Sequence, residues 1–218
     1  ALAELVRTCA LAHLSRPRLL ELAAATAAER IRDEEAPADE KPRGEHLAAL
    51  ATAYSTVYAS VPADGLFDAI ADEVADRAYA FKPQHLAAVA RSVSLVGVQH
   101  APMYDAIAAH ATPRLHRFKA FNLVSLALGF ATKRHEAPAL YGGVLQQVRI
   151  RPREFSRATV AKLEAALADV CALGDGRGPQ QQLGIAASAT TPMLLAGHEE
   201  VDGRHSREPS ALTPRRIT

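Results

Sequence analysis

The sequence predicts an all-α protein, namely an α-solenoid of antiparallel helix pairs followed by an irregular C-terminal tail. Three observations support this fold class. Ala and Leu, both strong helix formers, are abundant in the 218-residue chain. No window has the sustained apolar/polar alternation of a half-buried strand. Phe81, Phe118 and Phe155 stand 37 residues apart and each opens a similar segment, and a fixed period of about 20 to 50 residues indicates stacked repeats.

The repeat is clearest in two copies. The segment Phe81-Lys-Pro-Gln-His-Leu-Ala-Ala-Val-Ala90 is echoed by Phe118-Lys-Ala-Phe-Asn-Leu-Val-Ser-Leu-Ala127. Phe155-Ser-Arg-Ala-Thr-Val-Ala-Lys-Leu-Glu164 is a third, weaker copy, in which Glu164 takes the place of Ala90. Because a terminal repeat has to present a polar outer side, we expect this copy to close the array.

Each full copy is interpreted as two helices. The first helix of the clearest copy is expected from about Pro83 to Leu95, since Pro suits a first helical turn and Gly97 follows where a left-handed cap falls. Its apolar residues have the i, i+3, i+4, i+7 spacing of one buried stripe: Leu86, Val89, Ala90 and Val93. The second helix begins at Pro102, ends at Thr112-Pro113 and carries Met103, Tyr104, Ile107 and Ala108.

The same positions recur in the later copies. The stripe of the first helix becomes Leu123, Leu126, Ala127 and Phe130, and then Val160, Leu163 and Leu167. In the second helix, the counterparts of Met103, Tyr104 and Ile107 are Leu140, Tyr141 and Val144. One helix pair cannot enclose its own apolar face, so the pairs are expected to stack.

We therefore predict a helical-repeat solenoid over residues 1–173 and an extended tail over residues 174–218. The helix pairs are expected at about 1–33, 42–80, 81–117 and 118–154, with a closing helix over 155–173. Residues 33–44 are charged and contain proline, which predicts an exposed loop. The tail is mostly polar and lacks the repeat pattern, so we expect it to order only against a partner.

Two features of the composition bear on the cellular setting. No apolar run approaches the roughly 18–20 residues that span a bilayer, so we expect no membrane insertion. Cys9 and Cys171 lack the spacing of a disulfide framework, which fits a reducing compartment.

Charge is unevenly distributed along the chain. Residues 1–80 hold 14 acidic and 8 basic side chains, whereas residues 114–162 hold 10 basic and 2 acidic ones. Such asymmetry favours a polyanion partner for the second half. A solvated face is the alternative interpretation.

The candidate RNA-binding residues are the cations of this second half. Arg151 and Arg153 match Arg114 and His116 one period earlier, which places both sets on one edge of the predicted solenoid. Regularly spaced guanidinium groups suit phosphates, although a solvated or protein-facing edge is the alternative, and Lys133 and Arg134 could instead complement a helix C-terminus. The full set comprises Arg114, Arg117, Lys119, Lys133, Arg134, Arg149, Arg151, Arg153 and Arg157.

Other polar positions of the first helices could contact bases: Lys82, Gln84, Arg91, Lys119, Asn122 and Ser125. Ordinary surface residues are the simpler interpretation of most of them.

The sequence gives no indication of catalysis. The nine histidines form no His-Glu-x-x-His pattern and none lies near a cysteine pair, so no metal site is expected. Gly174-Asp-Gly-Arg-Gly178 follows a predicted helix instead of a strand and lacks the Gly-Lys-Ser/Thr ending of a phosphate loop. Tyr141-Gly-Gly143 lies inside a predicted helix, where close helix packing explains glycine better. We expect a non-enzyme without a cofactor.

The segment from Phe81 to Ala90, with a helix pair every 37 residues, resembles the organellar helical-repeat proteins of the heptatricopeptide type. The octotricopeptide proteins and the helical part of the Fas-activated kinase-like proteins with RAP domains are similar. These families share first-helix segments of the form Pro-Gln-x-Leu-Ala-x-(hydrophobic)-x-x-Ala. The resemblance covers residues 42–173 well and 1–33 loosely. The aromatic residue often found in the first helix is missing beside Ala90 and Ala127.

The resemblance implies an RNA-binding α-solenoid in a mitochondrion or, alternatively, a plastid. A free sequence-specific reader usually has more repeats, so a short array with a tail favours a fixed subunit. The expected function is a non-catalytic RNA-binding and structural subunit of a divergent mitochondrial ribosome, with rRNA on the basic edge and neighbouring proteins on the other face and the tail. The alternative is a protein–protein scaffold or accessory subunit of a mitochondrial respiratory or ATP synthase complex.

Overall fold

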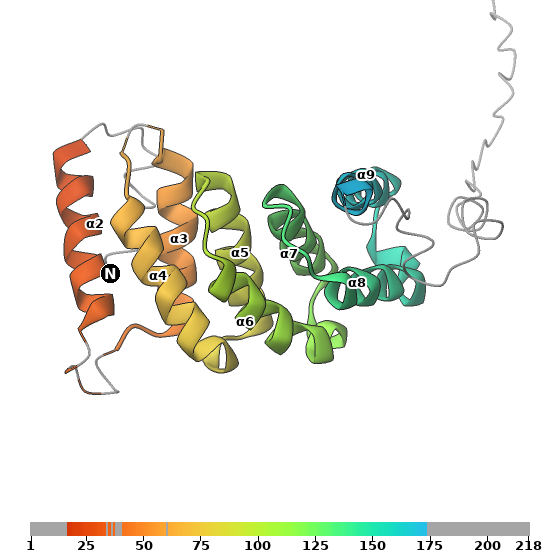
Figure 1. The fold of residues 1–218 in the computed structure, drawn as a ribbon, viewed down its shortest axis with the longest axis horizontal. Helices are drawn as coiled ribbons and strands as arrows, with labels where there is room; N and C mark the ends of the chain where they lie inside the picture. The colour runs from red at the N-terminus through yellow and green to blue at the C-terminus, as the bar shows by residue number, and fades with distance from the viewer. Residues whose placement is uncertain (1–16, 34, 36, 38–40, 60, 174–218) are drawn as a thin grey trace, which may run out of the picture. The chain divides into compact units, whose positions relative to one another are not determined.

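The computed structural model describes residues 17–33, 35, 37, 41–59 and 61–173. Within these residues the chain forms eight α-helices, three short 3₁₀-helices and no strand, as Figure 1 shows. The α-helices are α2 (Pro17–Arg32), α3 (Gly44–Val57), α4 (Asp64–Arg77), α5 (Pro83–Val96), α6 (Ala101–Ala111), α7 (Ala120–Thr132), α8 (Pro138–Ile150) and α9 (Arg157–Leu173). The 3₁₀-helices η1 (Ala78–Ala80), η2 (Thr112–Arg117) and η3 (Pro152–Glu154) follow α4, α6 and α8. The all-α prediction is confirmed for this part of the chain.

The helices alternate between two layers in a repeat-like arrangement. α3, α5, α7 and α9 contact one another in that order and form the first layer, whereas α2, α4 and α6 contact in turn and form the second. η2 contacts both α6 and α8, and we assign α8 to the second layer on this basis. The helices follow one another in chain order from α2 to α9 (Figure 1).

Two contacts show that α5 and α7 of the first layer run in the same direction. Gly129 of α7 lies against the backbone of α5, where an added Cβ would come within 2.9 Å of the carbonyl carbon and oxygen of Ala90. Further along both helices, the ammonium of Lys133 donates a hydrogen bond to the carbonyl oxygen of Gly97. The close approach at Gly129 explains why a residue without a side chain stands in the middle of α7.

The second-layer helices α4 and α6 are parallel as well. Asp72 of α4 contacts His100 before α6, and the ring of Tyr79 after α4 lies 6.3 Å from the ring of His110 near the end of α6. Short turns connect each first-layer helix to the following second-layer helix, so the two layers run in opposite directions. The 3₁₀-helices therefore lie at one end of the helices, and the turns after α5 and α7 lie at the other.

The second-layer helices begin at equivalent positions. Their N-caps Ala63, His100 and Ala137 are 37 residues apart in the sequence and have φ values of −136°, −145° and −146°. The side chain of His100 also caps the N-terminus of α6, because its Nδ1 accepts a hydrogen bond of 3.1 Å from the Met103 N–H. Such a cap satisfies one of the free donors at a helix start.

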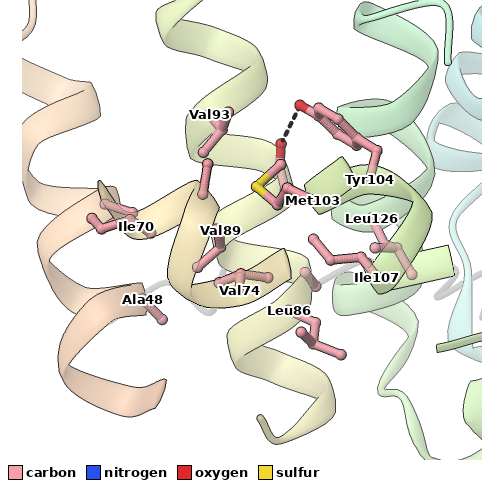
Figure 2. Packing of buried hydrophobic residues seen from close by; sticks show 14 of the residues in the cluster. Ala48, Ile70, Val74, Leu86, Val89, Val93, Met103, Tyr104, Ile107 and Leu126 are labelled. Carbon is pink, nitrogen blue, oxygen red and sulfur yellow. Dashed lines mark hydrogen bonds between the residues drawn. The ribbon is translucent and has the colours of Figure 1, made fainter. Parts of the chain in front are cut away.

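The predicted apolar stripes form the core. Figure 2 shows Val89 and Val93 of α5 packed among side chains of α4 and α6. The hydroxyl of Tyr104 in α6 donates a hydrogen bond of 3.4 Å to the Ala90 carbonyl, which is the dashed line in Figure 2. Its ring packs edge-on against the ring of Phe130, with 5.0 Å between the ring centroids. The residues expected in the stripes of α5 and α7 are all buried, namely Leu86, Val89, Ala90, Val93, Leu123, Leu126, Ala127 and Phe130.

The three spaced phenylalanines occupy corresponding positions in the turns before α5, α7 and α9. Phe81, Phe118 and Phe155 are buried, and each follows a 3₁₀-helix. Each main-chain N–H donates to the carbonyl three residues earlier, at 3.1 to 3.2 Å. Gly44, the first residue of α3, lies so close to the Phe81 ring that an added Cβ would come within 2.8 Å of it. The phenylalanines thus anchor the turn that leads into each first-layer helix.

Several expectations concern residues outside the described part of the chain. These are the first helix of the first pair, within residues 1–16, and the tail at 174–218. In the predicted loop over 33–44, Asp33, Glu35, Pro37 and Arg43 are exposed, whereas Lys41 and Pro42 are half-buried. Gly44, the last residue of the predicted loop, is the first residue of α3. α6 ends at Ala111, close to the predicted end at Thr112-Pro113, and the chain continues as η2 up to Arg117. None of the described helices combines the length and the apolar character needed to cross a bilayer.

Candidate nucleic-acid interface

The predicted basic residues fall into two groups at opposite ends of the helices. The larger group lies on what we call the turn edge, formed by η1, η2 and η3, the adjoining last turns of α4, α6 and α8, and the first turns of α5, α7 and α9. It contains Arg114, Arg117, Lys119, Arg149, Arg151, Arg153 and Arg157. Lys133 and Arg134 follow α7 and lie at the other end. At about 1.5 Å per residue, α7 separates the two groups by about 20 Å, so they do not form one site.

The guanidinium group of Arg151 contacts other residues of the same chain. Its Nη1 donates a hydrogen bond of 3.0 Å to the carbonyl oxygen of Phe118 and lies 3.5 Å from Glu154 Oε2. Its Nε and Nη2 are buried. The guanidinium therefore connects the end of α8 to the turn that precedes α7.

The same position is occupied by arginine one and two periods earlier. Arg77, Arg114 and Arg151 each stand four residues before a spaced phenylalanine. Arg114 Nε donates to the His110 carbonyl at 2.7 Å, and Arg77 Nε lies 3.0 Å from Glu73 Oε1. All three are partly buried near the carboxyl end of a second-layer helix, where a cation is favourable. These arginines stabilise the turns, and Arg114 and Arg151 present little free guanidinium to a ligand.

At the opposite end, the Lys133 ammonium contacts the carbonyl of Gly97, the C-cap of α5. Desolvation of this ammonium lowers the pKa of Lys133 below its usual value. Gly97 has a φ of 98°, the left-handed conformation expected for a glycine cap. Arg134, also in a left-handed conformation with a φ of 52°, is exposed. The contact of Lys133 agrees with the interpretation of this lysine as a complement to a helix C-terminus.

Five of the predicted cations remain exposed on the turn edge. They are Arg117, Lys119, Arg149, Arg153 and Arg157. Lys82 and His116 are exposed on the same edge, and Glu154 is the one acidic residue among the described residues of η2 and η3. The amino ends of α5, α7 and α9 add positive potential there. This edge can attract an extended anion.

Two exposed aromatic side chains on the turn edge were not predicted as functional. Phe121 in the first turn of α7 is 79% exposed, and Tyr79 in η1 is 64% exposed. The counterparts of Phe121 one period before and after are Gln84 and Ala158, which are also exposed. The exposure of Phe121 could have been predicted from the sequence, because the same position is polar or small in the other two copies.

The histidines of the second layer have structural partners. His100 Nε2 lies 2.9 Å from Asp72 Oδ1, and His135 Nε2 lies 2.9 Å from Asp105 Oδ1. Both histidines are half-buried. His100 connects the start of α6 to α4, and His135 connects the start of α8 to α6. No group of three His, Cys, Asp or Glu side chains suited to a metal ion occurs within the described residues.

Among the other polar candidates, Arg91 is engaged between the first-layer helices. Its Nη1 lies 3.4 Å from Thr132 Oγ1 and 3.5 Å from Ser94 Oγ. Gln84 is exposed in the first turn of α5, whereas Asn122 and Ser125 are half-buried. The side-chain amide of Gln84 lies 3.5 Å from His85 Nε2. Gln84 is thus more accessible than Arg91, which is held between two helices.

Comparison with protein-family models, with curated proteins and with solved structures gave no match to this chain.

Proposed function

We propose that this chain is a non-catalytic, RNA-binding structural subunit of a divergent mitochondrial ribosome. In this proposal its helix pairs form an α-solenoid with a 37-residue period. The turn edge binds rRNA, while other faces and the tail contact neighbouring proteins. The ribosomal and mitochondrial setting is supported by the resemblance of the first-helix segments to organellar helical-repeat proteins. The spacing of the N-caps Ala63, His100 and Ala137 supports the period.

The observation that carries the proposal is the set of exposed cations on the turn edge. Arg117, Lys119 and Arg153 are exposed. Arg117 lies in η2, Arg153 lies in η3, and Lys119 is the N-cap of α7. A set of exposed cations spread over successive turns suits the extended backbone of a nucleic acid better than it suits a compact anion. Arg114 and Arg151 hold the turns in place behind this set. Phosphate contacts of this kind position RNA without reading its sequence.

A matched pair of triple variants tests the proposal. The edge variant carries Arg117→Gln, Lys119→Gln and Arg153→Gln. The control variant carries Arg18→Gln, Arg30→Gln and Arg134→Gln, which removes equal charge from exposed positions on α2 and after α7, at the end of that helix away from the turn edge. The wild-type chain and the control variant are expected to co-sediment with mitochondrial ribosomes, and the edge variant is expected to be lost from them as salt is raised. Equal retention of both variants would contradict the role of the edge.

The second candidate function is a protein scaffold in a mitochondrial respiratory or ATP synthase complex. A specific observation favours it: α4 has exposed aspartates at every fourth position, which form one acidic stripe, namely Asp64, Asp68, Asp72 and Asp76. Asp64 accepts a hydrogen bond from Tyr58 and Asp72 contacts His100. A stripe of this kind suits a basic protein surface. Co-sedimentation of the chain with a membrane complex instead of ribosomes would favour this alternative.

A further inference from the structure

Phe121 is the most exposed large hydrophobic side chain among the described residues, at 79%. It is the second residue of α7, and the exposed cations Arg117 and Lys119 precede it directly. A phenyl ring that stays in water contributes little to the stability of the fold, because apolar surface stabilises a protein only when it is buried. The ring is therefore accessible to another molecule.

The surroundings of Phe121 indicate the chemistry of that contact. α7 lies between α5 and α9 in the first layer, and neighbouring helix axes are about 8–10 Å apart. Exposed cations occupy the start of both neighbours, Lys82 before α5 and Arg157 at the start of α9. A ring that anchored a protein partner would be expected within an apolar, desolvated patch. A ring surrounded by cations instead suits a base flanked by phosphates.

We propose that Phe121 is a stacking platform for an unpaired base, so that the turn edge binds single-stranded RNA. This inference rests on the proposed function and specifies its ligand. Lys119 contacts the phosphate beside the stacked base, and Arg117 extends the basic surface. The bases of a duplex are already stacked on one another and cannot cover the ring, so the platform selects single-stranded segments or loops.

A tryptophan reporter tests the stacking directly. The chain contains no Trp, so Phe121→Trp introduces a single indole whose fluorescence is quenched when a base stacks on it. The control is Leu95→Trp, in the last turn of α5 at the opposite end of the helices, where the leucine is 57% exposed. Titration of both full-length variants with oligouridylate is expected to quench the emission at position 121 only. Oligouridylate that binds without quenching this indole would overturn the proposal.

Affinity measurements separate the stacking from the proposed function. Phe121→Ala is expected to weaken oligouridylate binding about 5- to 140-fold, from about 1–3 kcal/mol per stacked base and about 1.4 kcal/mol per factor of ten. The slope of log affinity against log salt should stay unchanged, because no charge is removed. Binding of an RNA duplex should also be unchanged, as should the melting temperature of the protein.

Three other outcomes would overturn the stacking platform, the selection of unpaired bases or RNA binding as a whole. If the edge variant loses RNA and Phe121→Ala binds like wild type, the stacking platform is wrong and the proposed function stands. If Phe121→Ala weakens duplex and single-stranded RNA equally, selection of unpaired bases is wrong. If the wild-type chain binds neither RNA, both the platform and the RNA-binding function are overturned.

Discussion

The Nη1 of Arg151 donates a hydrogen bond of 3.0 Å to the carbonyl oxygen of Phe118, 33 residues earlier in the chain. The bond joins the turn after α8 to the turn before α7, and so fixes consecutive helix pairs relative to each other. Arg151 was a candidate for phosphate binding from its charge and spacing. Its contacts make it a structural residue that supports the exposed cations around it.

Replacing Arg151 should therefore change stability more than RNA affinity. Arg151→Gln is expected to lower the free energy of unfolding by about 1–3 kcal/mol, because a charge-assisted hydrogen bond to a partly buried carbonyl is lost. Arg153→Gln, two residues away and exposed, should stay within about 0.5 kcal/mol of wild type. Urea unfolding of the two variants measures the difference, and equal stabilities would show that the Phe118 contact contributes nothing.

The apolar stripes should be costly to truncate. Leu86→Ala and Leu123→Ala are each expected to lower stability by about 2–5 kcal/mol, since both leucines are fully buried in the first layer. Leu95→Ala, on the exposed side of α5, is the matched control and should change stability by no more than about 0.5 kcal/mol. Thermal melting of the three variants provides the comparison; the stripe assignment fails if all three melt together.

Two glycines should respond to alanine with opposite signs. Gly129→Ala places a Cβ 2.9 Å from the Ala90 backbone, which cannot move aside without separating α5 from α7, so the variant should be destabilised. Gly65, in the first turn of α4, has nothing within 4 Å of an added Cβ. Gly65→Ala should stabilise the protein by about 0.4–1 kcal/mol, because alanine lowers the conformational entropy of the unfolded chain. Chemical denaturation that gives the two variants the same sign would refute the close contact of α5 and α7.

Stability should depend on pH through His85. Desolvation, and then the charge of Lys82, lower the pKa of His85 below 6.5, while Glu45 acts in the opposite direction. The unfolded chain therefore binds a proton more readily than the folded protein. Neutral His85 contributes fully to the free energy of unfolding above pH 6.5. This contribution declines as the pH falls from there towards the lowered pKa, because the unfolded chain is protonated first.

The measurement is the melting temperature of wild type and His85→Asn at about pH 7.5 and about pH 5. The fall in melting temperature on acidification should be smaller in the variant, because other groups titrate in both proteins and cancel in the comparison. An identical fall would mean that His85 titrates alike in the folded and unfolded chains.

Local pattern predicted most of the helices and their buried faces. Pro83 and Gly97 bound α5 as expected, and the i, i+3, i+4, i+7 stripe around Val89 is buried. These features depend on residues close in sequence, whose geometry follows from helix periodicity. Gly143 was attributed to close packing, and an added Cβ there would overlap Leu115 Cδ1. The identity of this partner, which lies in η2, did not follow from the local pattern.

The basic edge was only partly predictable. Its position follows from the 37-residue spacing of the turns. Which cations remain free depends on contacts between consecutive helix pairs, such as that of Arg151 with Phe118 and that of Lys133 with Gly97. No local pattern fixes those distances. The exposure of Phe121 was missed for a related reason, because aromatic residues are usually counted with the core.

The salt dependence of RNA binding tests the central claim most directly. The log affinity of wild type for single-stranded RNA should fall linearly with log salt, with a slope of about −0.7 for each neutralised phosphate. The edge variant, which lacks the cations at Arg117, Lys119 and Arg153, should have a slope shallower by about 2, from three lost contacts at about 0.7 each. The control variant at Arg18, Arg30 and Arg134 should keep the wild-type slope. A slope that is the same in all three proteins would contradict the assignment of the turn edge as the RNA-binding surface.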